Sequence, residues 1–192
     1  MLRWQAVLSR ILSVINVMVS MSWPFIFYWA YENDKVMLIT LLLFLLIVLR
    51  LFIAYINKAS IFKNYKLNVA IGALCILALL IRSYDLMLYY PVLVNAVLLS
   101  VFALSLVNGP SFIERIARIK DPNLDARGIA YTKNLTIVWC IFFVINGSIS
   151  LFTILSNDME LWTLYNGVIS YLLIGALMVG EFIFRFFYLK RS

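Results

Sequence analysis

Long, uninterrupted apolar stretches are the feature that most restricts how this chain can fold. About 20 apolar residues in a helix cross the hydrocarbon core of a bilayer, and only helices or closed barrels satisfy their backbone groups there. The stretches are continuously apolar rather than alternating, so they predict an all-α membrane protein, a bundle of six transmembrane helices forming one domain over residues 1–192. The predicted spans are residues 11–30, 36–56, 67–81, 86–107, 135–155 and 161–188.

The composition agrees with lipid as the solvent of this chain. Hydrophobic residues make up 65% of the sequence, whereas a soluble domain is about 45–50% apolar. The first apolar stretch continues beyond the length of a signal peptide, so we interpret it as a retained span. The third is short and lies close to the fourth, which indicates a tight helical hairpin or, alternatively, a re-entrant pair. Pro24 and Pro91 are expected to kink their helices near the outer face.

The distribution of basic residues predicts the topology. Of the 16 Lys and Arg residues, Arg50 and Arg185 lie within predicted spans. With a cytoplasmic N-terminus, only Lys35 and Arg82 fall outside, and all the others lie on the cytoplasmic side. Because positive residues collect in cytoplasmic loops, we expect an inner (cytoplasmic) membrane protein with both termini inside. The net charge of +7 therefore reflects topology and membrane lipids as partners, not nucleic acid.

The cytoplasmic loop 108–134 contains a short amphipathic pattern. Ser111 and Glu114 have the spacing of a capping box, and Pro122 ends the segment. This pattern predicts a short helix in the headgroup region, with its basic face on anionic lipid; a solvated loop helix and a protein-docking helix are the alternatives. The expected apolar face consists of Phe112, Ile113, Ile116 and Ile119, and the expected membrane-surface face of Arg115, Arg118 and Lys120.

Three ionisable residues within predicted spans form the candidate ligand site. Glu181 and Arg185 have the i, i+4 spacing and order that favour an ion pair, and Arg50 is expected in the same cytoplasmic leaflet. Charge at this depth is costly and by default suggests function. The structural interpretation is that the arginines extend to the headgroups and Glu181 pairs with one of them. The functional interpretation is a site for a phosphate or carboxylate headgroup, and a proton path through Glu181 is a third possibility.

Two Asn-Gly dipeptides, Asn146-Gly147 and Asn166-Gly167, recur in the fifth and sixth spans, and Asn95 lies in the fourth. Small residues let membrane helices approach closely, and Asn bonds across their interface. We therefore expect these residues to pack helices, with a ligand-lining role as the alternative.

No catalytic or metal-binding motif is evident in the sequence. The chain has no histidine, which removes the commonest proton shuttle and metal ligand. Cys75 and Cys140 lie in apolar stretches and are interpreted as packing residues. We expect a protein that is not an enzyme and that needs no cofactor.

The C-terminal half, residues 86–188, resembles a family of bacterial inner-membrane proteins whose genes lie beside fatty-acid-synthesis-like and acyltransferase genes, including aryl polyene clusters. The resemblance rests on YYPVLVNA at 89–96, SFIERIAR at 111–118, WCIFFVING at 139–147 and LYNGVISYLL at 164–173 followed by Gly180-Glu181. The same layout is more distantly similar to the intracellular septation protein A (YciB) family. The resemblance implies an inner-membrane location and a link to envelope assembly, and it carries over no catalytic residue.

These features together predict a non-enzymatic inner-membrane accessory protein of cell-envelope or acyl-lipid and polyene biogenesis. Such a protein would bind a lipid-linked intermediate or scaffold envelope or acyl-chain biosynthesis enzymes at the inner leaflet. The alternatives are a small transporter or flippase for a lipid-like product, a septation- or cell-wall-associated membrane protein, and an enzyme subunit acting on a lipid headgroup.

Overall fold

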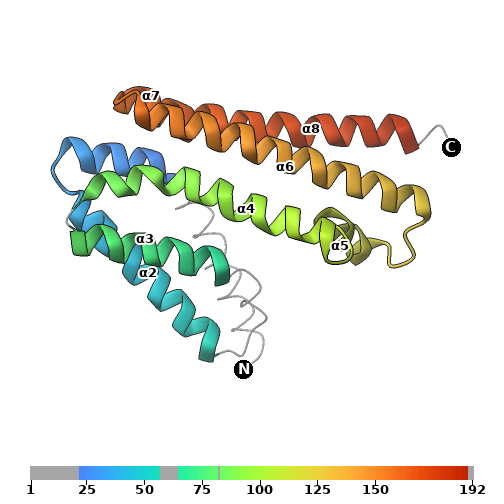
Figure 1. The fold of residues 1–192 in the computed structure, drawn as a ribbon, viewed down its shortest axis with the longest axis horizontal. Coiled ribbons are helices and arrows are strands. Elements are labelled where there is room, and N and C mark those ends of the chain that lie inside the picture. Colours follow the sequence, from blue (N-terminus) through green and yellow to red (C-terminus); the bar gives the residue numbers. More distant parts are fainter. Residues whose placement is uncertain (1–21, 57–64, 82, 190–192) are drawn as a thin grey trace. The chain divides into compact units, whose positions relative to one another are not determined.

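The computed structural model describes residues 22–56, 65–81 and 83–189, which are helical apart from short turns (Figure 1). No strand occurs among them, as the apolar stretches predict. Within this part of the chain, three helical stretches are long and apolar enough to cross a membrane. They are Asp85–Val107, Ala126–Leu155 and Met159–Phe187, which correspond to the fourth, fifth and sixth predicted spans. These stretches support a membrane protein.

The six-span count is not supported by these helices. Residues 11–21 of the first predicted span lie outside the described residues, and 22–32 are helical. The helices α2 (Val36–Ile56) and α3 (Tyr65–Ile81) have nearly the bounds of the second and third predicted spans. Their described apolar parts are Val36–Val48 and Ile71–Ile81.

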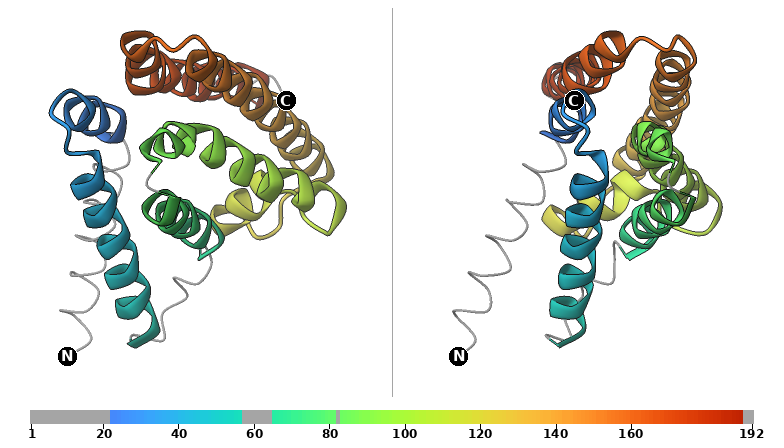
Figure 2. Two further views of the ribbon diagram at one scale, coloured as in Figure 1. Left: turned by 60° about the vertical axis from the view of Figure 1, so that its left-hand side comes forward. Right: turned by 90° about the vertical axis from the view of Figure 1, so that its left-hand side faces the viewer.

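The chain divides into two units, residues 40–155 and residues 1–39 with 156–192. In the first, α4 (Tyr90–Val107) packs along α6 (Ala126–Leu155), and α5 (Phe112–Lys120) packs against both (Figures 1 and 2). A 3₁₀ helix, η2 (Tyr84–Tyr89), precedes α4. Pro91 therefore lies in the first turn of an α-helix, where a missing N–H costs little, and the predicted kink is replaced by the junction of η2 and α4.

The contact between α4 and α6 follows a heptad pattern. Six of the seven buried residues on α6 are spaced three, four or seven residues apart, the periodicity with which two helices pack along their length. Asn95 of α4 meets Asn146, and Phe102 meets Phe143, so the two helices are antiparallel. Most of the buried residues of the two helices are polar or aromatic: Thr132, Thr136, Phe143, Asn146, Ser150 and Thr153 of α6 and Asn95, Phe102 and Ser105 of α4.

In the second unit, the helical residues 22–32 pack on α7 (Met159–Leu164), which continues through the π-helical segment η3 (Tyr165–Ile169) into α8 (Ser170–Leu189). The rings of Phe27 and Trp162 lie 5.4 Å apart between centroids, and both side chains are buried. Asp158 caps α7 by accepting a hydrogen bond from the Leu161 N–H at 2.9 Å. These contacts hold the first described helix against the start of the predicted sixth span.

Candidate functional site

The amphipathic helix α5 is the most strongly anchored feature of the predicted cytoplasmic loop. The first N–H groups of any helix lack partners within the helix. Here the Phe112 N–H donates to Ser105 Oγ of α4 at 2.8 Å, and the Ile113 N–H donates to Thr136 Oγ1 of α6 at 3.3 Å. The Glu114 N–H donates to Ser111 Oγ at 3.4 Å. Three hydroxyl groups, from α4, α6 and the N-cap of α5, therefore satisfy the first turn.

The two hydroxyls that come from neighbouring helices also donate hydrogen bonds of their own. Ser105 Oγ donates to the Phe102 carbonyl at 2.6 Å, and Thr136 Oγ1 donates to the Thr132 carbonyl at 2.8 Å. A hydroxyl has one donor and two acceptor positions, so each bonds its own helix and α5 at once. Both residues are buried, and both were missed by the sequence reasoning, because a hydroxyl at the end of an apolar stretch has no distinctive pattern.

Aromatic packing supports the same contact. The ring of Phe112 stacks on Phe102 with centroids 4.2 Å apart. Phe102 in turn contacts Phe143 edge-on at 5.1 Å and Trp139 at 6.4 Å. Aromatic pairs at these separations contribute about 0.5–1.5 kcal/mol beyond the area they bury. The cluster ties α5, α4 and α6 together at the end of the bundle from which the loop emerges.

The two arginines of α5 fix the segments on either side of the helix. Arg118 donates to Glu114 Oε1 from Nε at 2.9 Å and from Nη2 at 2.8 Å, and to the Pro122 carbonyl at 3.0 Å. Arg115 Nε donates to the Pro110 carbonyl at 2.8 Å. The predicted capping box is therefore formed through its serine, while the buried Glu114 carboxylate accepts from Arg118.

This arrangement changes the faces that the sequence predicts for α5. The inward side contains Ile113, Glu114 and Ala117, and the predicted apolar face is divided. Ile116 and Ile119 remain 52% and 83% exposed. Of the three predicted membrane-surface cations, Arg118 is half-buried in its ion pair. The exposed face, which we call the outward face of α5, consists of Arg115, Ile116, Ile119 and Lys120.

The fifth-span Asn-Gly pair lies at the contact with α4. Asn146 Nδ2 donates to Asn95 Oδ1 at 3.1 Å, and Asn95 Nδ2 donates to the Pro91 carbonyl at 2.8 Å. A Cβ atom added to Gly147 would lie 3.1 Å from the Asn95 Cβ. The glycine therefore permits the approach that the Asn–Asn hydrogen bond requires.

The second pair, Asn166-Gly167, lies in the π-helical segment η3. Asn166 is buried, and its Nδ2 donates to the Trp162 carbonyl at 2.9 Å. A Cβ atom on Gly167 would lie 2.8 Å from Phe25 Cζ. Wider π turns occur frequently at functional sites, but here the observed contacts are those of packing between residues 22–32 and η3.

The three residues of the predicted headgroup site lie in different units. Glu181 and Arg185 form an ion pair on α8, with Arg185 Nε 3.6 Å from Glu181 Oε1 and side-chain exposures of 20% and 50%. Arg185 also lies 6.0 Å from the centre of the Phe182 ring. Arg50 belongs to α2 in the other unit, and its side chain lies outside the described part. The site formed by all three residues thus stays a prediction.

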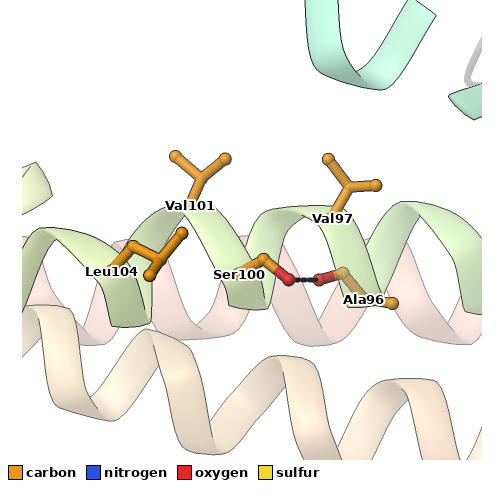
Figure 3. Close-up of a pocket in the computed structure, with 5 residues that line it drawn as sticks. All are labelled: Ala96, Val97, Ser100, Val101 and Leu104. Carbon is orange, nitrogen blue, oxygen red and sulfur yellow. Dashed lines mark hydrogen bonds between the residues drawn. The ribbon is translucent and has the colours of Figure 1, made fainter. Parts of the chain in front are cut away.

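A shallow groove of about 210 Å³ follows the surface of α4 (Figure 3). All five described lining residues belong to this helix: Ala96, Val97, Ser100, Val101 and Leu104. The Ser100 hydroxyl donates to the Ala96 carbonyl at 2.7 Å, and the surface of the groove is mainly apolar (Figure 3). Among the described residues, no group of three or more Cys, Asp or Glu side chains is placed to hold a metal ion.

No protein-family model, curated protein or solved structure matches the chain in the three comparisons.

Proposed function

We propose that this protein is a non-enzymatic accessory protein of a bacterial inner membrane, acting at the cytoplasmic leaflet in cell-envelope or acyl-lipid biogenesis. The proposed topology is six spans with both termini in the cytoplasm, which the asymmetry of Lys and Arg supports. The link to envelope assembly rests on the family resemblance of residues 86–188. The contact with lipid is proposed for the outward face of α5.

The observation that carries this proposal is the position and composition of that face. Residues 108–111 join α5 to α4, and residues 121–125 join it to α6, and both neighbours are membrane-length helices. Four residues span at most about 14 Å, so α5 lies close to the plane where α4 ends. A helix there that exposes Ile116 and Ile119 between Arg115 and Lys120 has the composition of an interfacial helix.

The basic residues on the outward face of α5 favour an anionic lipid. A basic residue near an anionic leaflet contributes about 1 kcal/mol to binding. Lys120 is exposed, and the Arg115 guanidinium uses only its Nε in the bond to Pro110, so both have donors for a phosphate oxygen. Arg118 is committed to Glu114 and Pro122. We therefore assign lipid contact to Arg115 and Lys120 and a structural role to Arg118.

The test uses the full-length protein in neutral detergent, titrated with phosphatidylglycerol or phosphatidylcholine while native mass spectrometry counts bound lipid. The unmodified protein should retain phosphatidylglycerol preferentially. The double variant Arg115→Gln/Lys120→Gln should need about 30-fold more phosphatidylglycerol, because two contributions of about 1 kcal/mol are lost. Arg127→Gln removes an exposed cation from the first turn of α6 and serves as the matched control.

Equal phosphatidylglycerol binding by the double variant and the control would refute the lipid contact. A double variant that keeps its lipid but loses co-purifying envelope enzymes would also refute it, and would assign the outward face of α5 to a protein partner.

A further inference from the structure

The hydroxyl groups that cap α5 distinguish it from a helix that folds on a membrane. A nine-residue helix is too short to be stable alone in water. Many amphipathic surface segments therefore order only when they bind. In this chain, hydroxyl groups within residues 40–155 satisfy the first turn of α5.

The two capping hydroxyls also decide which side of α5 faces outward. Ser105 and Thr136 approach the first turn from α4 and α6 respectively. Their bonds fix the rotation of α5 about its own axis, because the Phe112 and Ile113 N–H groups lie at adjacent positions of one turn. The Phe102–Phe112 stack favours the same rotation of α5. With this rotation, Ile113 and Glu114 face the bundle and the outward face of α5 is exposed.

We propose that Ser105 and Thr136 are positioning residues that keep α5 folded and docked before any lipid is bound. The helix is then a preformed platform, and binding at its outward face orders no backbone. This inference rests on the proposed function only for the identity of what binds there. We expect the docking itself to persist in neutral detergent, where no anionic lipid is present.

A purely local role for the two hydroxyls is the competing explanation, because Ser and Thr in helices often bond a carbonyl of the preceding turn. Ser100 on α4 and Ser148 on α6 provide the comparison. Each donates to the carbonyl four residues earlier, at 2.7 and 2.8 Å, and both are exposed. Ser100→Ala and Ser148→Ala therefore remove the same kind of local bond on the same helices without a buried cap.

The experiment measures amide hydrogen exchange at residues 112–114 of the full-length protein in neutral detergent, by mass spectrometry with fragmentation that resolves single amides. Thr136→Val removes the hydroxyl and keeps the side-chain shape, whereas Thr136→Ser keeps the hydroxyl. We expect Thr136→Val to exchange the Ile113 amide about fivefold faster or more, the effect of losing about 1 kcal/mol from one hydrogen bond. Thr136→Ser, Ser100→Ala and Ser148→Ala should resemble the unmodified protein.

Ser105→Ala should act in the same way on the Phe112 amide, and it provides a second test should Thr136→Val fail to fold. Thr136→Val should speed exchange most at the Ile113 amide, and Ser105→Ala should speed it most at the Phe112 amide. Equal exchange in Thr136→Val and Thr136→Ser, or uniform loosening of all three amides, would overturn the proposal. So would fast exchange of the unmodified protein in neutral detergent that slows only in anionic nanodiscs.

These outcomes are separate from those of the lipid test. Protected amides together with unchanged lipid binding in Arg115→Gln/Lys120→Gln would leave the docking intact and reject the proposed function. Unprotected amides in the unmodified protein, together with a lost phosphatidylglycerol preference in Arg115→Gln/Lys120→Gln, would reject the docking and leave the proposed function intact.

Discussion

Gly147 provides the sharpest prediction about how the α4–α6 contact is held together. A methyl group added by Gly147→Ala would lie 3.1 Å from the Asn95 Cβ, closer than two carbon atoms pack comfortably. The Asn95 side chain has little freedom to withdraw, because its Nδ2 is bonded to the Pro91 carbonyl and its Oδ1 to Asn146. The strain therefore has to separate α6 from α4, which also lengthens the Asn95–Asn146 hydrogen bond.

The size of the effect follows from three contributions. Overpacking a close contact costs about 1–3 kcal/mol, and a hydrogen bond between membrane helices is worth about 0.6 kcal/mol. Replacing a helical glycine by alanine returns about 1 kcal/mol of helix propensity. Gly175→Ala isolates this last contribution, because nothing lies within 4 Å of its added Cβ. Gly147→Ala should therefore be about 2 kcal/mol less stable than Gly175→Ala, or about 4–8 °C lower in Tm.

Thermal unfolding of the purified protein in detergent, followed by tryptophan fluorescence, measures this difference. A cycle with Asn95→Gly tests its cause, because that substitution removes the Cβ that the new methyl group meets. In the Asn95→Gly background, the penalty of Gly147→Ala should largely disappear. A Gly147→Ala variant as stable as Gly175→Ala, or a penalty unchanged by Asn95→Gly, would refute the close contact as the reason for this glycine.

Two further predictions use the same measurement. Gly167→Ala should lower Tm less than Gly147→Ala does, although its new Cβ lies only 2.8 Å from a neighbouring atom. That atom is the end of the half-exposed Phe25 ring, which is able to rotate away. A larger loss of Tm than in Gly147→Ala would contradict this. Arg118→Met should destabilise the protein by about 1–3 kcal/mol, because it leaves the buried Glu114 carboxylate without its cation; Arg115→Met is the comparison, and equal Tm values would show that the buried pair contributes nothing.

The helical fold is predicted well by the sequence, and so are the bounds of α2 and nearly those of α3, whereas the starts of α4 and α6 are not. Apolar runs mark the part of a helix that lies at hydrocarbon depth. They do not reveal polar residues that continue the helix beyond this depth. For this reason the fifth span is expected from residue 135, while α6 begins at Ala126 and carries the exposed Arg127 and Lys133. The opposite error occurs at the fourth span, where the apolar run includes the 3₁₀ turn η2 and the α-helix begins at Tyr90.

The orientation of α5 about its axis is not predicted correctly by its own sequence. Its periodicity groups all four apolar residues on one side, as would suit a helix lying alone on a surface. The rotation in the structure depends instead on hydroxyls at Ser105 and Thr136, one before α5 and one after it in the chain. The sequence therefore identified that an amphipathic helix exists and where it ends, but not that Ile116 and Ile119 would remain exposed.

The polar seam between α4 and α6 connects these observations. Between membrane helices there is little hydrophobic driving force, so association depends on close packing and on hydrogen bonds. The seam uses both, with the Asn95–Asn146 bond and Gly147 towards one end and the α5-capping hydroxyls of Ser105 and Thr136 towards the other. Since one antiparallel contact carries both features, we expect a change that separates the helices at Gly147 to reach the caps of α5 as well. The stability of this seam and the exposure of the proposed lipid surface are therefore expected to be coupled, and amide exchange at residues 112–114 in Gly147→Ala would reveal that coupling.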